Sequence, residues 1–139
     1  IYEIPEAIYE LSNLRYLQLR GNLIEHVSPK IKNLSNLIKL ELNNNNLSKL
    51  PKEIGNLHNL LYLELQYNKL SEIPKEIGDL HNLLHLELQS NNLIEIPNEI
   101  GNLSNLRRLY IGCNYNLAEL PNEIMNLCNL LELNIYNTK

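Results

Sequence analysis

Leucines and polar residues alternate along this chain in a pattern that returns at a fixed interval. Residues 60–82 read LLYLELQYNKLSEIPKEIGDLHN, and residues 83–105 repeat this stretch with few changes, so that equivalent leucines lie 23 residues apart. A fixed period of this length indicates a stack of equivalent supersecondary units, each of which contacts only its neighbours. The pattern therefore predicts a solenoid.

The first half of each unit is expected to form a short strand. Leu63 and Leu65 are two residues apart, so their side chains point to the same side of a strand. Tyr62, Glu64 and Gln66 then point to the other side. One such strand is too short to bury its leucines alone. Stacking it on its copies forms a parallel sheet that covers a continuous core.

The second half of each unit, IPKEIGDLHN, is expected to form a short helix or 3-10 turn. Pro74 suits the first position of such a helix, and Glu76 then lies in the first turn, where negative charge is favoured. Gly78 would allow the helix to end. Three apolar residues at spacings of four and three are expected to face the core: Ile73, Ile77 and Leu80.

We expect one array over residues 1–139, with a partial repeat at 1–13, full repeats at 14–36, 37–59, 60–82, 83–105 and 106–129, and a partial repeat at 130–139. The first full repeat delays its proline to Pro29, and the fifth carries one extra residue after Asn114. That insertion is either neutral or re-aims Tyr115 toward a partner. Neither end shows a polar capping repeat, so we expect a fragment of a longer protein that self-associates through its uncapped ends.

The pattern L-x-x-L-x-L-x-x-N-x-L falls on Leu60, Leu63, Leu65, Asn68 and Leu70, and it recurs in register through nearly all of the chain. In this pattern the chain resembles the leucine-rich repeat family. The resemblance implies an α/β solenoid, a leucine-rich repeat horseshoe with a parallel concave sheet and short helices or 3-10 turns on the convex side.

The 23-residue form with L-P-x-E-I-G-x-L-x-N is similar to the cytoplasmic class of this family, which includes Ras-group-related plant proteins and animal scaffolds that bind Ras-family GTPases. This resemblance implies a non-enzymatic protein-interaction scaffold in signalling, with a small GTPase as one candidate partner. The shared motifs are scaffold residues, so no binding residue of the family can be transferred to this chain.

An asparagine recurs where each expected strand ends. A buried amide carries both donors and acceptors, and the turn there leaves backbone groups that need partners. We interpret these residues as a structural ladder and not as site residues: Asn22, Asn45, Asn68, Asn91 and Asn114.

Composition and charge narrow the function further. Hydrophobic residues make up 44% of the chain with no Trp or Phe, so leucine and isoleucine must build the core. The formal net charge of −4 argues against a nucleic-acid binder, which usually carries a basic stripe. No apolar run is long enough to span a membrane. Cys113 and Cys128 fall on different sides of the repeat, so we expect no disulfide and a cytoplasmic location.

The sequence contains no recognisable catalytic or cofactor motif: no P-loop, no G-x-G-x-x-G, no G-x-S-x-G and no H-E-x-x-H. His58 and His81 occupy equivalent places in successive repeats, but only Asp79 lies near them in sequence, and a zinc site needs three or four ligands. We therefore expect no enzyme activity, no cofactor and no metal.

The outward strand positions vary from repeat to repeat, so function is expected there. Glutamates in one column would stack at about 4.8 Å, which is unfavourable unless a cation lies nearby. Lys39 and Arg108 flank this column, and His85 would contribute if it were protonated. Two interpretations remain open, a self-compensated solvated face and an acidic strip for a basic segment of a partner. The column contains Glu41, Glu64 and Glu87.

Five tyrosines also fall on the expected concave side. Tyrosine and arginine are enriched among residues that dominate binding energy, so this number indicates a contact surface. The tyrosines are Tyr16, Tyr62, Tyr67, Tyr110 and Tyr136. We place the centre of the surface at Tyr62, Glu64, Glu87, Arg108 and Tyr110.

We therefore predict a non-enzymatic scaffold that binds a protein partner on its concave face. The alternative is the recognition arm of a larger multidomain enzyme, such as a kinase, a GTPase or a ubiquitin ligase, whose catalytic part lies outside this chain. The open ends motivate the alternative.

Overall fold

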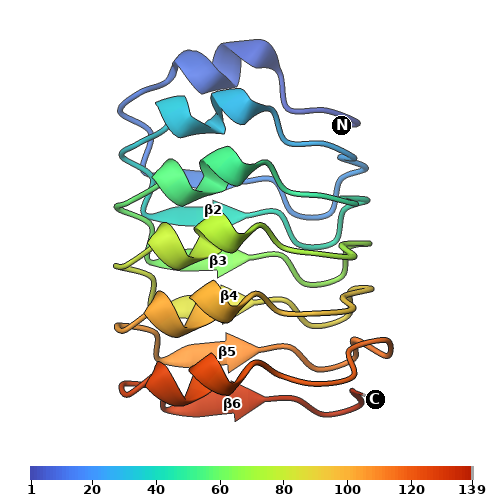
Figure 1. The fold of residues 1–139 in the computed structure, drawn as a ribbon. Helices are drawn as coiled ribbons and strands as arrows, with labels where there is room; N and C mark the ends of the chain where they lie inside the picture. The colour runs from blue at the N-terminus through green and yellow to red at the C-terminus, as the bar shows by residue number, and fades with distance from the viewer. Residues whose placement is uncertain (139) are drawn as a thin grey trace.

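The structure, a computed structural model, describes residues 1–138 and shows a stack of similar layers with the two chain ends at opposite ends of the stack (Figure 1). Each layer contributes one short strand to a parallel sheet whose order follows the sequence. Within the described residues there are six strands: β1 (Tyr16–Gln18), β2 (Lys39–Glu41), β3 (Tyr62–Glu64), β4 (His85–Glu87), β5 (Arg108–Tyr110) and β6 (Glu132–Asn134).

The register of the sheet follows the sequence period. Leu17 pairs with Leu40, which pairs with Leu63 on the next strand. The extra residue of the fifth repeat leaves this register intact, because Leu109 pairs with Leu133 as the repeat pattern requires. The predicted parallel solenoid sheet is therefore confirmed, and equivalent residues of successive repeats lie side by side.

Each layer returns through a 3-10 helix, and these helices lie together on the side of the stack opposite the strands (Figure 1). The expectation of short helices or 3-10 turns is confirmed. Their bounds are η1 (Glu6–Glu10), η2 (Pro29–Asn33), η3 (Lys52–Asn56), η4 (Lys75–Asp79), η5 (Asn98–Asn102) and η6 (Asn122–Asn126).

The proline of the repeat does not take the first helical position that we predicted. Pro74 precedes η4 with φ −66° and ψ 145°, which is extended backbone, and the helix begins at Lys75. The fixed φ of proline suits either conformation, and its ψ decides that it lies outside the helix. Pro29 is the exception, because the delayed proline of the first repeat is the first residue of η2.

Gly78 has a different role from the one predicted. It lies within η4, which ends at Asp79 with Leu80 as its C-cap, so the glycine does not end the helix. A Cβ atom on Gly78 would lie 2.5 Å from the carbonyl oxygen of Glu99 in the next layer. Gly55 and Gly101 stand in the same relation to the layers that follow them. Glycine is needed here because consecutive helices approach so closely.

The core lies between the sheet and the helices. Leu63 and Leu65 of the strand half and Ile77 and Leu80 of the helix half are fully buried, as the pattern predicted. Tyr9 takes the place that glycine has in η3, η4 and η5, and its side chain is also buried. Its hydroxyl accepts a hydrogen bond from the backbone N–H of Ser28 at 3.1 Å, so its polar end has a partner.

The repeated asparagines hold neighbouring layers together through the backbone. The amide nitrogen of Asn68 donates to the carbonyl oxygens of Leu65 at 3.0 Å and Leu42 at 2.9 Å. Its oxygen accepts from the backbone N–H of Leu47 at 2.9 Å. One side chain thus satisfies backbone groups of its own layer and of the layer before. The same three bonds are made by Asn45, Asn91 and Asn114, and Asn22 donates to its own layer.

The residue just before each asparagine adopts a left-handed conformation, which sequence analysis did not identify. Gly21 does so with φ 69°, and Tyr67 does so with φ 58°. Left-handed backbone angles are unfavourable for residues other than glycine and asparagine. We infer that the hydrogen bonds between stacked layers impose this turn. The other members of this column with positive φ are Asn44, Ser90, Cys113 and Asn137.

Candidate protein-binding face

The outward side chains of β1 to β6 form one surface, which we call the sheet face. The predicted partner-binding residues lie on it or at its edge, with Tyr67 in the turn that follows β3 and Tyr136 after β6. The structure places Tyr16, Lys39, Glu41, Tyr62, Glu64, Tyr67, His85, Glu87, Arg108, Tyr110 and Tyr136 on this side. They are not equivalent, because their charges are paired differently along the stack.

Lys39 neutralises the first two glutamates of the acidic column. Its ammonium lies 2.7 Å from the carboxylate of Glu41 and 2.8 Å from that of Glu64. Glu41 is 4% exposed, and Gln18 also donates a hydrogen bond to it at 2.8 Å. Hydrogen bonds to these carboxylates raise the pKa of Lys39 to about 12. Burial opposes ionisation of Glu41, but Lys39 and Gln18 outweigh it and lower its pKa.

Arg108 flanks the acidic column as predicted, but it forms its ion pair with another strand. Its guanidinium lies 2.8 Å from the carboxylate of Glu132 on β6. The hydroxyl of Tyr110 donates to the other oxygen of the same carboxylate. Glu132 is therefore held by two side chains of β5, and this triad forms the C-terminal part of the sheet face.

His85 is packed against an aromatic ring and is not an additional cation. Its ring centroid lies 4.8 Å from that of Tyr62 on β3, with the two planes tilted by 57°. Burial, together with the positive charge of Arg108, lowers the pKa of His85. The imidazole is therefore neutral at physiological pH, and the predicted contribution of a protonated His85 is not supported.

Glu87 is the member of the acidic column that lacks a cation. No Lys or Arg side chain of residues 1–138 lies within ion-pair distance of its carboxylate. Gln89 donates to it through Nε2 at 3.2 Å, which is a weak replacement. Burial and the negative charge of Glu64 raise the pKa of Glu87 despite this bond. The column is thus compensated by Lys39 at Glu41 and Glu64, and Glu87 has no ion-pair partner among the described residues. Binding of a basic segment of a partner stays a prediction.

Three amide side chains of the sheet face were not among the predicted site residues. Asn43 and Gln66 are 7% and 8% exposed, and each has a buried side-chain oxygen with no hydrogen-bond partner among the described residues. The side-chain oxygen of Gln89 is in the same state. The alternating pattern places these residues on the outward side. Their burial depends on the neighbouring side chains, which the pattern does not reveal.

Tyrosines gather at the edge of the sheet face around Cys113. Tyr67, Tyr115 and Tyr136 are 55%, 67% and 51% exposed. Hydrogen bonding from Tyr136, and to a lesser degree from Tyr115, lowers the pKa of the Cys113 thiol. Tyr115, next to the residue inserted in the fifth repeat, thus lies beside Cys113. Whether the insertion is neutral or re-aims Tyr115 toward a partner stays a prediction.

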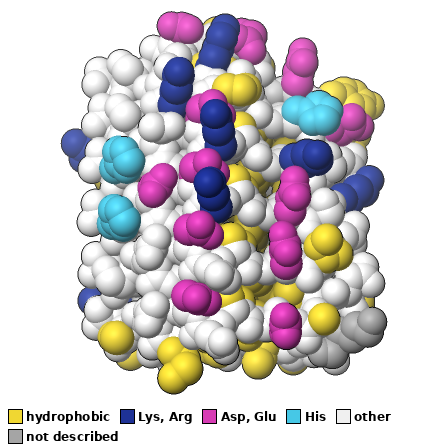
Figure 2. All heavy atoms as spheres, viewed as in Figure 1, with side chains coloured by type: hydrophobic (Ala, Val, Ile, Leu, Met, Phe, Trp, Pro, Cys, Tyr) yellow, Lys and Arg dark blue, Asp and Glu magenta, His cyan; other side chains and the backbone are white. Residues whose placement is uncertain are grey.

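The helix face carries a different arrangement of charge, with two columns of acidic side chains along the stack (Figure 2). One column lies in the first turns of the 3-10 helices, where the sequence predicted acidic residues. It consists of Glu53, Glu76, Glu99 and Glu123. A second set of glutamates, each two residues before the proline of its repeat, consists of Glu72, Glu95 and Glu119.

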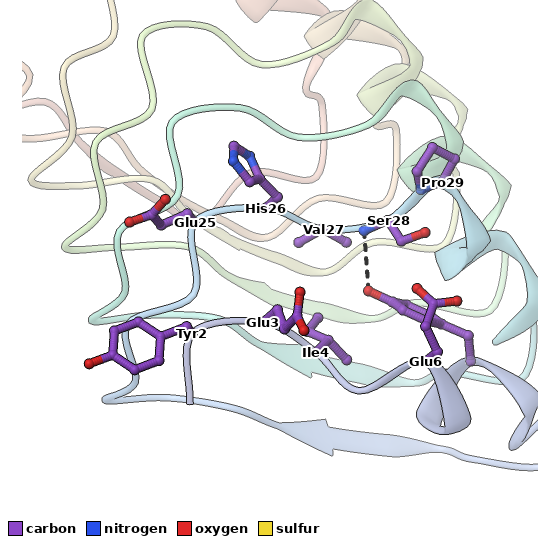
Figure 3. A pocket seen from close by; sticks show the side chains of 10 residues that line it. Tyr2, Glu3, Ile4, Glu6, Glu25, His26, Val27, Ser28 and Pro29 are labelled. Atoms are coloured by element: carbon purple, nitrogen blue, oxygen red, sulfur yellow. Dashed lines mark hydrogen bonds between the residues drawn. The ribbon is translucent and has the colours of Figure 1, made fainter.

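A hollow of about 470 Å³ lies between the N-terminal partial repeat and the first full repeat (Figure 3). Three of its lining residues are acidic, but the carboxylate of Glu6 is already paired with Lys30 at 2.5 Å. The Tyr9 hydroxyl in its wall is bonded to Ser28 (Figure 3). Within residues 1–138, no group of three His, Cys, Asp or Glu side chains is placed to hold a metal ion.

The described helices are all too short to cross a membrane. The sheet face combines paired charges, one unpaired carboxylate, buried amides and exposed aromatic rings. Such a surface is suited to recognising another polypeptide, because aromatic anchors and directional polar groups are the features of binding interfaces.

Comparison with known proteins establishes the class. A model of leucine-rich repeat regions matches residues 52–139, and a second leucine-rich repeat model matches residues 12–70. The chain therefore belongs to the leucine-rich repeat family. A comparison with curated proteins finds no match.

Several solved structures share the fold. A leucine-rich repeat protein of Leptospira interrogans is 35% identical with a TM-score of 0.79, and the match covers 100% of this chain and 41% of that one. The ectodomain of the Arabidopsis thaliana receptor kinase GASSHO1/SCHENGEN3, solved in complex with Casparian strip integrity factor 2, is 31% identical with a TM-score of 0.86, covering 99% of this chain and 17% of that one. The functional domain of InlJ from Listeria monocytogenes, 23% identical with a TM-score of 0.86, shares the fold over 99% of this chain and 28% of its own.

Proposed function

We propose that this chain is a non-enzymatic protein-interaction module that binds a protein partner through its sheet face. The observation that carries this proposal is the placement of Tyr62, Glu64, Glu87, Arg108 and Tyr110 on the adjoining strands β3, β4 and β5. These residues provide aromatic and charged groups over a continuous surface, whereas the helix face carries columns of acidic side chains with Lys and Arg side chains among them in its N-terminal part (Figure 2).

The relatives support the class of function. Leucine-rich repeat regions generally bind protein partners, and the GASSHO1/SCHENGEN3 ectodomain was solved as a complex. The chain spans less than half the length of the Leptospira protein and of the receptor kinase ectodomain. The activities of those whole proteins are therefore not transferred to this chain. Recognition by this array as part of a larger enzyme is the second candidate, and the receptor kinase relative favours it.

The test compares two triple variants that each keep the net charge. Tyr62→Ala/Glu87→Lys/Arg108→Glu alters the sheet face, and Lys75→Glu/Glu99→Lys/Met125→Ala alters the helix face. Both are checked for folding by circular dichroism and then used with the wild type to capture proteins from lysate of the source cells. We expect a captured protein that is lost with the first variant and retained with the second.

The opposite pattern, with loss only for the helix-face variant, would reject the sheet face as the binding surface. The identity of the captured protein also tests two finer parts of the proposal. The resemblance to Ras-group scaffolds makes a small GTPase one candidate partner, and a captured protein of another class would remove it. We also place the module in the cytoplasm, which is supported by the free thiols of Cys113 and Cys128.

A further inference from the structure

One carboxylate of the sheet face, that of Glu87, has no cation of residues 1–138 paired with it. Lys39 engages Glu41 and Glu64, and Arg108 engages Glu132. Glu87 lies between these two groups, and within the described chain it has no ion-pair partner. A half-buried carboxylate without a cation costs free energy, so this position is arranged to receive a positive charge from outside.

The surroundings of Glu87 supply further acceptors that lack donors. Gln89 gives its Nε2 to Glu87 at 3.2 Å, and its own Oε1 has no partner among residues 1–138. Gln66 follows β3, the strand that pairs with β4. It is 8% exposed, and its Oε1 also has no hydrogen-bond partner among the described residues. A buried acceptor without a donor is unfavourable, so a ligand that brings several N–H groups would be stabilised here.

The aromatic ring of Tyr136 lies near Gln89, on the side of the C-terminal layers. The backbone N–H of Ser90, next to Gln89, donates to the carbonyl of Gly112 at 2.9 Å, so these two strand ends adjoin. Gly112 has no side chain, and a Cβ atom there would lie 2.8 Å from the ring of Tyr136. The ring therefore occupies the space over Gly112, on the strand path next to that of Gln89.

We propose that Glu87, with the amide oxygens of Gln66 and Gln89, forms a site for an arginine side chain of the partner protein. The guanidinium is planar, carries five N–H donors in a fixed arrangement and stacks on aromatic rings, which matches a carboxylate, two amide oxygens and Tyr136. A lysine ammonium is a point charge with three donors and uses this arrangement less fully. This inference rests on the proposed function, because it names the chemistry of the partner at the same face.

The test uses a defined probe, the peptide acetyl-(Gly-Arg)3-amide, with matched peptides that carry lysine or citrulline in place of arginine. Citrulline keeps the shape of arginine and removes its charge. Binding is followed at low ionic strength by calorimetry and by the side-chain amide resonances of Gln66 and Gln89 in ¹H–¹⁵N spectra. We expect the side-chain amide resonances of Gln66 and Gln89 to shift with the arginine peptide. The lysine peptide should bind several-fold more weakly, and the citrulline peptide should not bind.

Two variants with the same change of charge locate the site. Glu87→Gln is expected to weaken binding of the arginine peptide about tenfold or more. Glu99→Gln, on the helix face, is expected to leave it unchanged. An equal effect of the two variants, or binding without shifts of Gln66 and Gln89, would overturn the proposal. Equal binding of the arginine and citrulline peptides would overturn it as well.

The two proposals fail in different ways. If lysate capture does not depend on the sheet face while the arginine peptide still needs Glu87, the proposed function is wrong and the arginine site stands. If capture depends on the sheet face but the captured protein binds Glu87→Gln as tightly as the wild type, the arginine site is wrong and the function stands.

Discussion

At the scale of single residues, the acidic column shows how neighbours decide the state of one residue type. Glu41 and Glu87 occupy equivalent positions two repeats apart, and both are shielded from solvent. The pKa of Glu41 is lowered because Lys39 and Gln18 outweigh its burial. The pKa of Glu87 is raised because burial and Glu64 outweigh its bond from Gln89. The repeat pattern assigns both residues the same position, and their neighbours separate them, with Lys39 and Gln18 at Glu41 and, among the described residues, only Gln89 at Glu87.

This difference predicts the effect of pH on the stability of Glu87→Gln. A raised pKa means that folded protein holds the Glu87 proton at pH values where unfolded protein has lost it. The stability contribution of Glu87 is therefore complete below its ordinary pKa and declines as the pH rises through its folded pKa. Glutamine is neutral throughout, so the variant is expected to be more stable than the wild type at pH 7 and to lose this advantage near pH 4.

Urea unfolding of both proteins from pH 4 to pH 7.5 measures this effect, with Glu25→Gln as the control for removing one exposed acidic charge outside the glutamate columns. Glu41→Gln should behave in the opposite sense. The lowered pKa of Glu41 stabilises the folded protein above its ordinary pKa, and this stability is lost as the pH falls through the folded pKa. A Glu87→Gln variant that is less stable than the wild type at pH 7 would show that the carboxylate already has a cation.

At the scale of elements, the period of the sequence correctly predicted the strand order and register, whereas Pro74 and Gly78 were assigned the wrong places in the helix. The 23-residue spacing was enough for the parallel order and the register, because a fixed period places equivalent residues side by side. Pro74 and Gly78 were misplaced because general rules for helix ends assume an isolated helix. Here the spacing between layers determines which residue fits.

Gly78→Ala tests this role of layer spacing. The new methyl group would lie 2.5 Å from the carbonyl oxygen of Glu99, so consecutive helices must move apart. Overpacking of this kind costs about 1–3 kcal/mol, and we expect the free energy of unfolding to fall by that amount in urea titrations. The better helix propensity of alanine would produce an increase instead, if Gly78 were an ordinary helical residue with room for a methyl group.

Lys32 provides the matched control, since it occupies the equivalent position of η2 and already carries a Cβ atom. Lys32→Ala is expected to change stability by less than about 0.5 kcal/mol. Similar losses for the two variants would show that the position tolerates no change in general, and that close approach of the layers is not the cause.

The candidate site was predictable only in part, for a related reason. The alternating pattern places Glu64, Glu87 and Tyr110 on the sheet face, because side-chain direction in a strand has a period of two. It does not reveal that Lys39 reaches across to two glutamates or that Arg108 turns toward Glu132. Long flexible side chains choose among several neighbours, and that choice depends on packing across three strands.

At the scale of the whole molecule, acidic charge is distributed unevenly along the helix face. Lys and Arg side chains lie among the acidic ones in the N-terminal part of the stack, whereas the charged side chains in the C-terminal part of this face are mainly acidic (Figure 2). Lys52 and Lys75 precede Glu53 and Glu76 in sequence, but Asn98 takes the equivalent place before Glu99. Lys49 approaches Glu72 to 4.0 Å, and no described cation forms such a pair with Glu95 or Glu119. Repulsion therefore accumulates toward the C-terminal layers.

The stability of the array should for this reason rise with salt. The screening length falls from about 30 Å in 10 mM salt to about 8 Å in 150 mM, which weakens repulsion between glutamates of non-adjacent layers. The pairs of Lys39 are less affected because Glu41 is 4% exposed. Scanning calorimetry in 10 and 150 mM NaCl should show a higher Tm in the second, by about 2–6 °C if relief amounts to about 1 kcal/mol.

Glu99→Lys supplies the decisive comparison, because it places a cation between Glu76 and Glu123 in the unbalanced part of the column. This variant should have a higher Tm in low salt and a smaller rise on adding salt, since part of the repulsion is already removed. A Tm that falls as salt is added to the wild type would mean that the ion pairs of the sheet face dominate. Repulsion between the glutamates of the helix face would then have little effect on the stability of the stack.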